Sequence, residues 1–248
     1  MTKIQTNELL PCIKNYSSIH TAGEVVTTLE LLHHELLDAD IASLSVFNHI
    51  YLIITRNLET AIYHDMFENS DIVATHIVDF ASLYFQALEG YVLHTKIPKA
   101  WEITFQFYKN KTSFQMTYLV LAANAHINAD LPIVLANLTS SISFQSDYKQ
   151  IQRIIFESLP EILAGLRTYI THSYVIERRL IWLYPIGIKI IMSWWRVRVW
   201  ITKTKLFSKK TTRKIIDSYA GKTASRIILF TKIISTNIAS LKTRDSHN

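Results

Sequence analysis

Apolar residues recur every three or four positions along most of the chain, which is the spacing of an α-helix that buries one face. The motif Thr21-x-x-Glu24 fits a capping box and predicts a helix that continues to about residue 37. Strand-like alternation is short and rare. We therefore expect an all-α protein of about ten helices, and the first half is predicted to contain further helices over residues 41–63, 71–91, 99–109 and 112–126.

Proline and capping residues predict the helix boundaries in the second half. Proline lacks an N–H group, so we expect one helix to end near Asn128 and Asp130 to cap the next, with Pro132 in its first turn. Asp147 is expected to cap a later helix. The remaining helices are predicted over residues 160–178, 187–206, 210–220 and 223–241.

Composition excludes several classes of protein. The chain has only 5 Gly in 248 residues and contains no GxGxxG, GxxxxGK[ST] or GxSxG motif, which argues against phosphate-cradling loops and a nucleophile elbow. The single cysteine, Cys12, excludes an intrachain disulfide and a thiolate-rich zinc site. No apolar segment follows a basic start, so no secretory signal is expected. We expect a cytoplasmic protein, either free or peripheral at the membrane.

Charge is distributed unevenly along the chain. Residues 1–150 contain 8 Lys and Arg against 15 Asp and Glu, whereas residues 151–248 contain 18 against 5. We expect a flexible N-terminal segment (1–20), a single helical domain (21–202) and a basic helical extension (203–248). Six cations at the start of this extension form a candidate anion-binding group: Lys203, Lys205, Lys209, Lys210, Arg213 and Lys214. No recognition-helix signature accompanies them, so an anionic membrane surface is a better candidate partner than nucleic acid. The alternative is a solvated basic face that binds neither.

The most apolar run, residues 180–201, is about long enough to span a bilayer. Lys189, Arg196 and Arg198 lie within it and disfavour a spanning helix, because a cation is costly at the membrane centre. We expect a core helix whose cations reach out to solvent. The alternative is a helix in the membrane interface, which would suit four tryptophans of this run: Trp182, Trp194, Trp195 and Trp200.

One segment carries a resemblance to a known family. Residues 124–132 read NAHINADLP, so four polar residues follow a very apolar stretch. The segment resembles the signature NAHINxDLP of a bacterial helical family described only as a domain of unknown function. The resemblance covers roughly residues 20–200 and implies a helical fold but no reaction. Other fragments occur in the order of that family: Phe47 with Tyr51 and Thr55, Phe80-Ala81 with Tyr84, Trp101 with Phe105, Asp147-Tyr148 with Ile151, and more weakly Arg196 with Trp200.

The same segment holds the candidate catalytic residues. His126 could act as a base, Asp130 could orient it, and Asn124 and Asn128 could contact substrate amides. The alternative is that these side chains only cap and satisfy a helix junction. The first reading predicts an enzyme with hydrolase-like or metal-assisted activity on a small, apolar and unidentified molecule. Its buried pocket would be lined by Tyr51, Tyr84 and Trp101.

A metal site is a further interpretation of this cluster. Zinc or iron would be held by His126 and Asp130 with a third ligand such as His33, because histidine and carboxylate ligands require no cysteine. His34, His49 and His76 are alternative third ligands. The sequence equally allows a protein that is not an enzyme and that binds an anionic membrane peripherally through residues 180–214. It does not indicate an oligomeric state.

Overall fold

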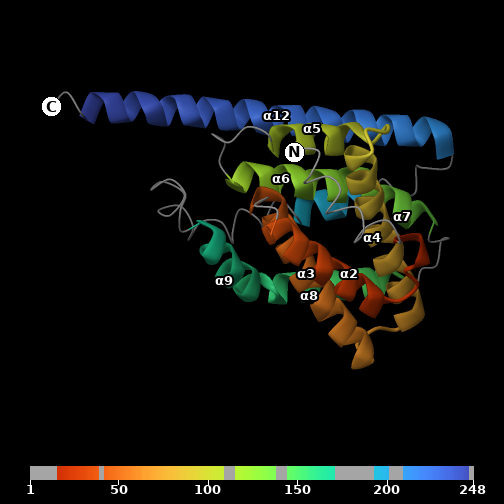
Figure 1. Cartoon of the computed structure of the whole chain (residues 1–248). Helices are drawn as coiled ribbons and strands as arrows, with labels where there is room; N and C mark the ends of the chain where they lie inside the picture. Colours follow the sequence, from red (N-terminus) through yellow and green to blue (C-terminus); the bar gives the residue numbers. More distant parts are fainter. Residues whose placement is uncertain are drawn as a thin grey trace.

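The computed structural model describes residues 16–38, 42–108, 115–137, 144–170, 193–200 and 209–245. Every regular element in these ranges is helical and none is a strand, so the all-α fold is confirmed (Figure 1). A further helix covers residues 193–200. The other elements are η1 (Tyr16–Ser18), α2 (Ala22–Asp38), α3 (Ala42–Tyr63), α4 (Ser70–Val92), α5 (Lys99–Tyr108), α6 (Gln115–Ala125), η2 (His126–Asp130), α7 (Leu131–Asn137), α8 (Phe144–Glu157), α9 (Leu159–Ile170) and α12 (Lys209–Asp245).

Helix starts in the first half follow the sequence closely. The capping box is confirmed, because the backbone N–H of Glu24 donates to Thr21 Oγ1 at 3.2 Å and the Thr21 N–H donates to the Glu24 carboxylate at 3.0 Å. α3, α4 and α5 each begin and end within one residue of the predicted bounds. Local signals thus place these helices correctly.

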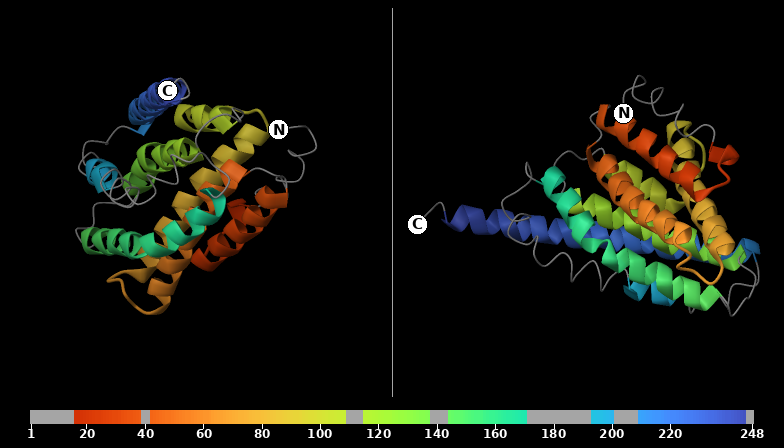
Figure 2. Two further views of the ribbon diagram at one scale, coloured as in Figure 1. Left: turned by 90° about the vertical axis from the view of Figure 1, so that its left-hand side faces the viewer. Right: turned by 90° about the horizontal axis from the view of Figure 1, so that it is seen from below.

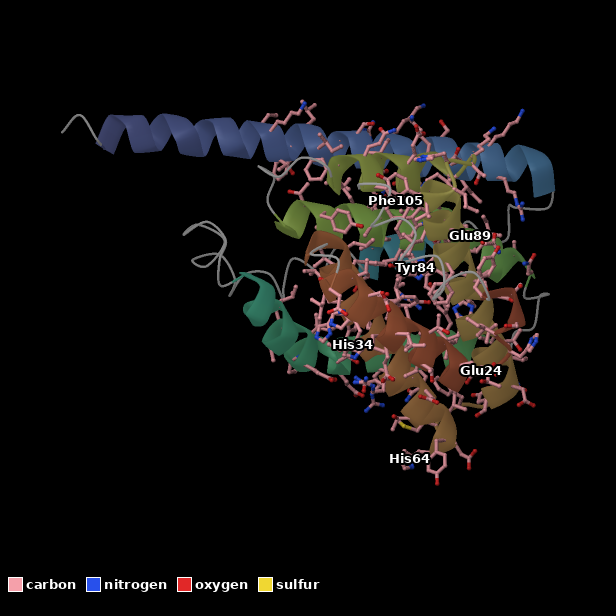
Figure 3. The ribbon with its side chains drawn as sticks, viewed as in Figure 1. Glu24, His34, His64, Tyr84, Glu89 and Phe105 are labelled. Atoms are coloured by element: carbon pink, nitrogen blue, oxygen red, sulfur yellow. The ribbon has the colours of Figure 1, made fainter. Side chains whose placement is uncertain are left out.

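α3 and α6 lie at the centre of the molecule. α3 packs against α2 along its length and also contacts α4, α6, α8 and α9. α5 and α6 lie between this group and the long helix α12, which crosses one side of the molecule (Figures 1 and 2). Tyr84 of α4 and Phe105 of α5 are buried among the helices (Figure 3). The core is therefore rich in aromatic side chains.

α12 is one continuous helix, so the predicted break between a helix over residues 210–220 and a helix over residues 223–241 is wrong. Its middle packs closely on α5 and α6 through Ala220, Gly221 and Ala224, of which both alanines are fully buried. A Cβ atom at Gly221 would lie 3.1 Å from Lys99 Cγ, so glycine permits the close approach. Asp217 also accepts a hydrogen bond from the backbone N–H of Lys99 at the start of α5.

One segment, Thr117–Asn137, is long and apolar enough to cross a membrane by length and composition. Most of it (78%) is buried inside the protein, and a buried core helix passes the same test. Most of the apolar run over residues 180–201 lies outside the described residues; only 193–200 is described, as a helix.

The prediction that Asp147 caps its own helix is wrong. It lies inside α8, is buried, and accepts hydrogen bonds from the backbone N–H groups of Glu68 at 2.7 Å and Asn69 at 3.0 Å. These groups immediately precede α4, so the carboxylate satisfies the donors at the start of a different helix and favours its N-terminal dipole. Asp147 thereby ties α8 to α4.

We expect Asp147→Ala to lower the free energy of unfolding by about 2 kcal/mol, because two partly buried backbone donors at the start of α4 lose their acceptor. Asp147→Asn keeps one acceptor oxygen and should lose less. Urea unfolding at neutral pH measures both. Asp71→Ala removes an exposed carboxylate from the first turn of the same helix and serves as the control, with a loss below about 1 kcal/mol. Equal losses at the two positions would contradict the conclusion that Asp147 satisfies the backbone donors at the start of α4.

Candidate functional site

The polar motif lies in one widened turn of a continuous helix. α6 runs without interruption through η2 into α7, and the backbone N–H of Leu131 donates to the carbonyl of His126, five residues earlier. The predicted helix end near Asn128 and the predicted cap at Asp130 are therefore wrong. Pro132 has no N–H to continue an α-helical ladder, and the π-helical turn before it carries the chain past the proline. Such turns are frequent at functional sites.

Asp130 is a buried carboxylate with two nitrogen partners. Its Oδ2 accepts a hydrogen bond from Trp101 Nε1 at 2.9 Å and lies 3.0 Å from His126 Nδ1. Burial raises the pKa of Asp130, and the hydrogen bonds from His126 and Trp101 oppose this effect. Because an ionised carboxylate only accepts hydrogen bonds, His126 carries its proton on Nδ1 in this arrangement.

The imidazole of His126 packs against two aromatic rings. Phe80 stacks on it with a centroid distance of 3.6 Å and an interplanar angle of 11°, and Tyr51 meets it edge-on at 4.7 Å. Burial lowers the pKa of His126, against the opposing effect of Asp130. The neutral form is thus favoured at neutral pH. Nε2 is buried and has no hydrogen-bond partner among the described residues.

His126 lines a mainly apolar cavity of about 110 Å³. Helices α3, α4, α6, η2, α8, α9 and the helix over 193–200 contribute to its wall. The cavity is somewhat smaller than one of about 150 Å³ that holds benzene, so it fits a group of a few carbon atoms. Apolar side chains that face it include Phe47, Ile54, Leu119, Ile155, Leu159 and Trp195.

Arg196 lines the same cavity and is only 3% exposed. The prediction that this arginine reaches out to solvent is therefore wrong. Its guanidinium carbon lies 4.6 Å above the centre of the Tyr148 ring, while the Tyr148 hydroxyl donates to the backbone carbonyl of Arg196 at 3.3 Å. Among the described residues, no group bonds to Nε or Nη2 of Arg196, although both atoms are buried.

His76 of α4 is a third buried basic side chain in this region. Its ring stacks on the ring of Phe80 with a centroid distance of 5.9 Å. Phe80 also stacks on the ring of His126. Burial, together with the charges of Arg196 and His126, lowers the pKa of His76 to about 3. His76 and His126 thus both pack on Phe80, and the charge of Arg196 contributes to lowering the pKa of each histidine.

Asn124 and Asn128 lie on another side of the same helical segment. Asn124 Nδ2 donates to the carbonyl of Ala220 in α12 at 3.0 Å, and Asn128 Nδ2 donates to Asn124 Oδ1 at 3.0 Å. Neither asparagine lines the cavity. Asn124 thereby ties α6 to α12, and Asn128 supports the Asn124 side chain. The predicted contacts to a substrate amide remain a prediction.

The three predicted pocket residues have different positions. Tyr51 lines the cavity, whereas Tyr84 and Trp101 are fully buried behind His126, each with a ring centroid 6.2 Å from the imidazole. Trp101 acts instead as the donor to Asp130. The fragments that carried the family resemblance thus meet around this site: Phe47, Tyr51, Phe80, Tyr84, Trp101, Tyr148 and Arg196.

The predicted metal ligands are not gathered into one site. His33 stacks on His49 at 5.0 Å, and burial with the nearby charges of His49 and His34 lowers its pKa to about 4. His34 follows it on the same helix and is exposed. Within the part of the chain that the structure describes, no group of three or more His, Cys, Asp or Glu is arranged to hold a metal ion. The zinc or iron hypothesis thus gains no support.

The predicted anion-binding group is described only in part. Lys203 and Lys205 lie outside the described residues, and Lys209 and Lys210 form the first residues of α12. Arg213 and Lys214 follow in the same helix and are exposed. The structure therefore leaves this group as a prediction.

Sequence reasoning gave no role to Arg196 or Phe80 in this cavity, and it considered His76 only as an alternative metal ligand. The available signal for Arg196 was its place in an apolar, tryptophan-rich run, next to Trp195 and three residues before Val199, which are both buried. An arginine on that face must be buried or must bend away. The sequence alone does not decide between these two outcomes.

The chain was compared with known proteins. A family model described as a family of unknown function, DUF5995, matches residues 22–234. No curated protein and no solved structure matches the chain. The matched region includes every residue of the cavity and most of α12.

The pKa of His76 predicts a loss of stability in acid. The unfolded chain takes up a proton below about pH 6.5, but the folded protein does so only near pH 3, so stability falls as the pH drops through this window. This group alone should cost about 2 kcal/mol between pH 7 and pH 5. Urea unfolding of His76→Leu should therefore show a shallower loss than the wild type over this range.

His64→Gln is the control for this measurement, because His64 is exposed just after α3 (Figure 3) and does not line the cavity of His126. Its pH dependence should match that of the wild type. If His76→Leu also matches the wild type, His76 is not buried in its neutral form.

Proposed function

The chain belongs to the DUF5995 family, whose description names no function, and we propose that it is a hydrolytic enzyme in which His126 acts as a general base on a small, mainly apolar substrate. The observation that carries this proposal is the asymmetry of the imidazole. Nδ1 is bound to Asp130, whereas Nε2 is buried without a partner among the described residues. One nitrogen is oriented and the other is left for chemistry.

Asp130 supports the role of His126 in two ways. It fixes the tautomer that leaves the lone pair on Nε2, and it stabilises the imidazolium that forms when Nε2 takes a proton. Trp101 in turn holds the carboxylate through Oδ2. The lowered pKa of His126 keeps Nε2 unprotonated at neutral pH, as a base requires.

The nucleophile in this proposal is water. None of the described residues that line the cavity is Ser, Thr or Cys, so the wall supplies no side chain of the usual nucleophilic types. His126 Nε2 removes a proton from a water molecule as its oxygen attacks the carbonyl carbon of an ester. The ester C–O bond then breaks, the proton passes from Nε2 to the leaving alcohol, and a carboxylic acid remains.

We expect the protein to hydrolyse short 4-nitrophenyl esters such as the acetate and butyrate, and His126→Asn to lower the rate by about a hundredfold or more. Asparagine places an N–H near the position of Nδ1, so it can keep the bond to Asp130 while it removes the base. Initial rates of nitrophenolate release measure the effect. The wild-type rate should fall only in acid, below the lowered pKa of His126.

His34→Asn is the matched control, because His34 is exposed on α2 and does not line the cavity. Its rate should equal that of the wild type. The proposal fails if wild type and His126→Asn hydrolyse every ester equally, and also if the wild type is no faster than buffer.

A second candidate function is peripheral binding to an anionic membrane through α12. Three large apolar side chains of this helix are more than half exposed, namely Leu229 at 60%, Phe230 at 65% and Ile233 at 51%. Arg226 and Lys232 are exposed beside them. Figures 1 and 2 show that the C-terminal half of α12 extends beyond the other helices. Apolar residues flanked by cations favour the headgroup region of acidic lipid.

Co-sedimentation with vesicles tests this candidate. The protein should bind phosphatidylcholine vesicles only when they contain phosphatidylserine, and salt should weaken the binding because it screens the cations. The double variant Leu229→Ser, Phe230→Ser should bind less, whereas Met66→Ser, which removes an exposed apolar side chain elsewhere, should bind as the wild type does. Equal binding to neutral vesicles would argue against the electrostatic contribution.

A further inference from the structure

The cavity contains a buried positive charge that has no counterion among the described residues. Arg196 is 3% exposed, and its guanidinium group is cationic. Two of its three nitrogens, Nε and Nη2, are buried and have no hydrogen-bond partner among the described residues. Burial of a charged group without a partner is strongly unfavourable, so this arrangement calls for an anion.

The described surroundings do not supply that anion. The face of the Tyr148 ring provides a cation–π contact at 4.6 Å, which compensates only part of the lost hydration. Asp130 is the buried carboxylate of the site, and its Oδ2 is already bound by Trp101 and His126. The other basic groups near Phe80 are His76 and His126, which add no negative charge. A negatively charged ligand would satisfy the free nitrogens of Arg196.

The shape and lining of the cavity define the rest of the ligand. Its wall is apolar apart from His126, Arg196 and the Tyr51 hydroxyl, and its volume of about 110 Å³ fits only a few carbon atoms. A single arginine fork matches a carboxylate, whereas a phosphate group is larger and more strongly hydrated and needs further donors. The ligand therefore has a short apolar chain that ends in one carboxylate.

We infer that Arg196 is the anion-binding group of the cavity and that the cavity binds small apolar monocarboxylates, the acids that hydrolysis of the proposed ester substrate would release. This inference rests on the proposed function only where it describes the acid as the product of hydrolysis. Binding of the acid does not require that reaction. Arg196 lines the cavity together with His126, so the acyl carboxylate would lie between the guanidinium and the imidazole.

Isothermal titration with butyrate and with butyramide tests the inference on the wild-type protein. The two molecules have the same shape, but only butyrate is charged. We expect butyrate to bind at least about tenfold more tightly, because a hydrogen bond to a charged group is worth more than a neutral one. Equal affinities, or binding of neither molecule, would overturn the inference without the need for any variant.

Arg196→Met keeps much of the apolar stem and removes the charge. We expect this variant to lose the preference for butyrate and to melt at the same temperature as the ligand-free wild type or at a higher one, because it removes a buried and unpaired charge. A purely structural arginine would instead lower the melting temperature when it is replaced. Butyrate should raise the melting temperature of the wild type but not that of Arg196→Met.

Arg198→Met is the matched control. Arg198 lies two residues away on the same helix, with its guanidinium over the ring of Tyr219, and it does not line the cavity. This variant should keep the preference for butyrate. If Arg196→Met keeps the preference, or if Arg198→Met loses it equally, Arg196 is not the anion-binding group.

Butyrate binding and ester hydrolysis, both measured on the wild-type protein, separate this inference from the proposed hydrolysis. If the wild type binds butyrate and hydrolyses no ester, the proposed function fails and the anion site stands. If esters are hydrolysed but butyrate and butyramide bind equally, the proposed function stands and the anion site fails.

Discussion

The carboxylate of Asp130 is the group on which the arrangement of the site depends. An ionised carboxylate is costly to bury unless it is well hydrogen-bonded, and Asp130 is 1% exposed. Its two donors come from different elements, Trp101 from α5 and His126 from η2. The need to satisfy one oxygen therefore sets the distance between these helices and the orientation of the imidazole. The stacked ring of Phe80 and the free Nε2 follow from that orientation.

A proline inside a buried helix imposes a second constraint. Pro132 cannot donate a backbone hydrogen bond, and the helix that contains it is almost entirely buried, so an open break would leave polar groups without partners. The π-helical turn resolves the conflict by widening the helix at residues 126–130. The turn presents His126 toward the cavity and Asn128 toward α12. One local distortion thus sets the direction of both groups.

Sequence patterns predict the first half of this fold well because its helix starts depend on local chemistry. The hydrogen bonds of Thr21 and Glu24 lie within a single turn and can be recognised from spacing. The errors concern side chains whose partners are distant in sequence. Asp147 binds backbone groups 78 and 79 residues away, and Gly221 packs against Lys99 instead of ending a helix. Spacing along the chain contains no information about such partners.

The same holds for the candidate site: pairs close in sequence were predictable, and partners distant in sequence were not. The pair of His126 and Asp130 follows from a four-residue separation, and the structure places them in contact. Arg196, which lines the same cavity, could not be found in this way, because its burial depends on how the helix over residues 193–200 packs against Tyr148. A charged residue in an apolar run has two possible orientations, and only tertiary packing selects between them.

The contact with α12 lies within one turn of the cavity wall. His126 faces the cavity, and Asn124, two residues earlier, donates to the carbonyl of Ala220 in α12, while Asn128 donates to Asn124 Oδ1. A change in the register of the π turn would therefore move His126 together with Asn128, the residue that supports the Asn124 side chain. The wall of the cavity and the seat of α12 thus depend on the same turn of helix.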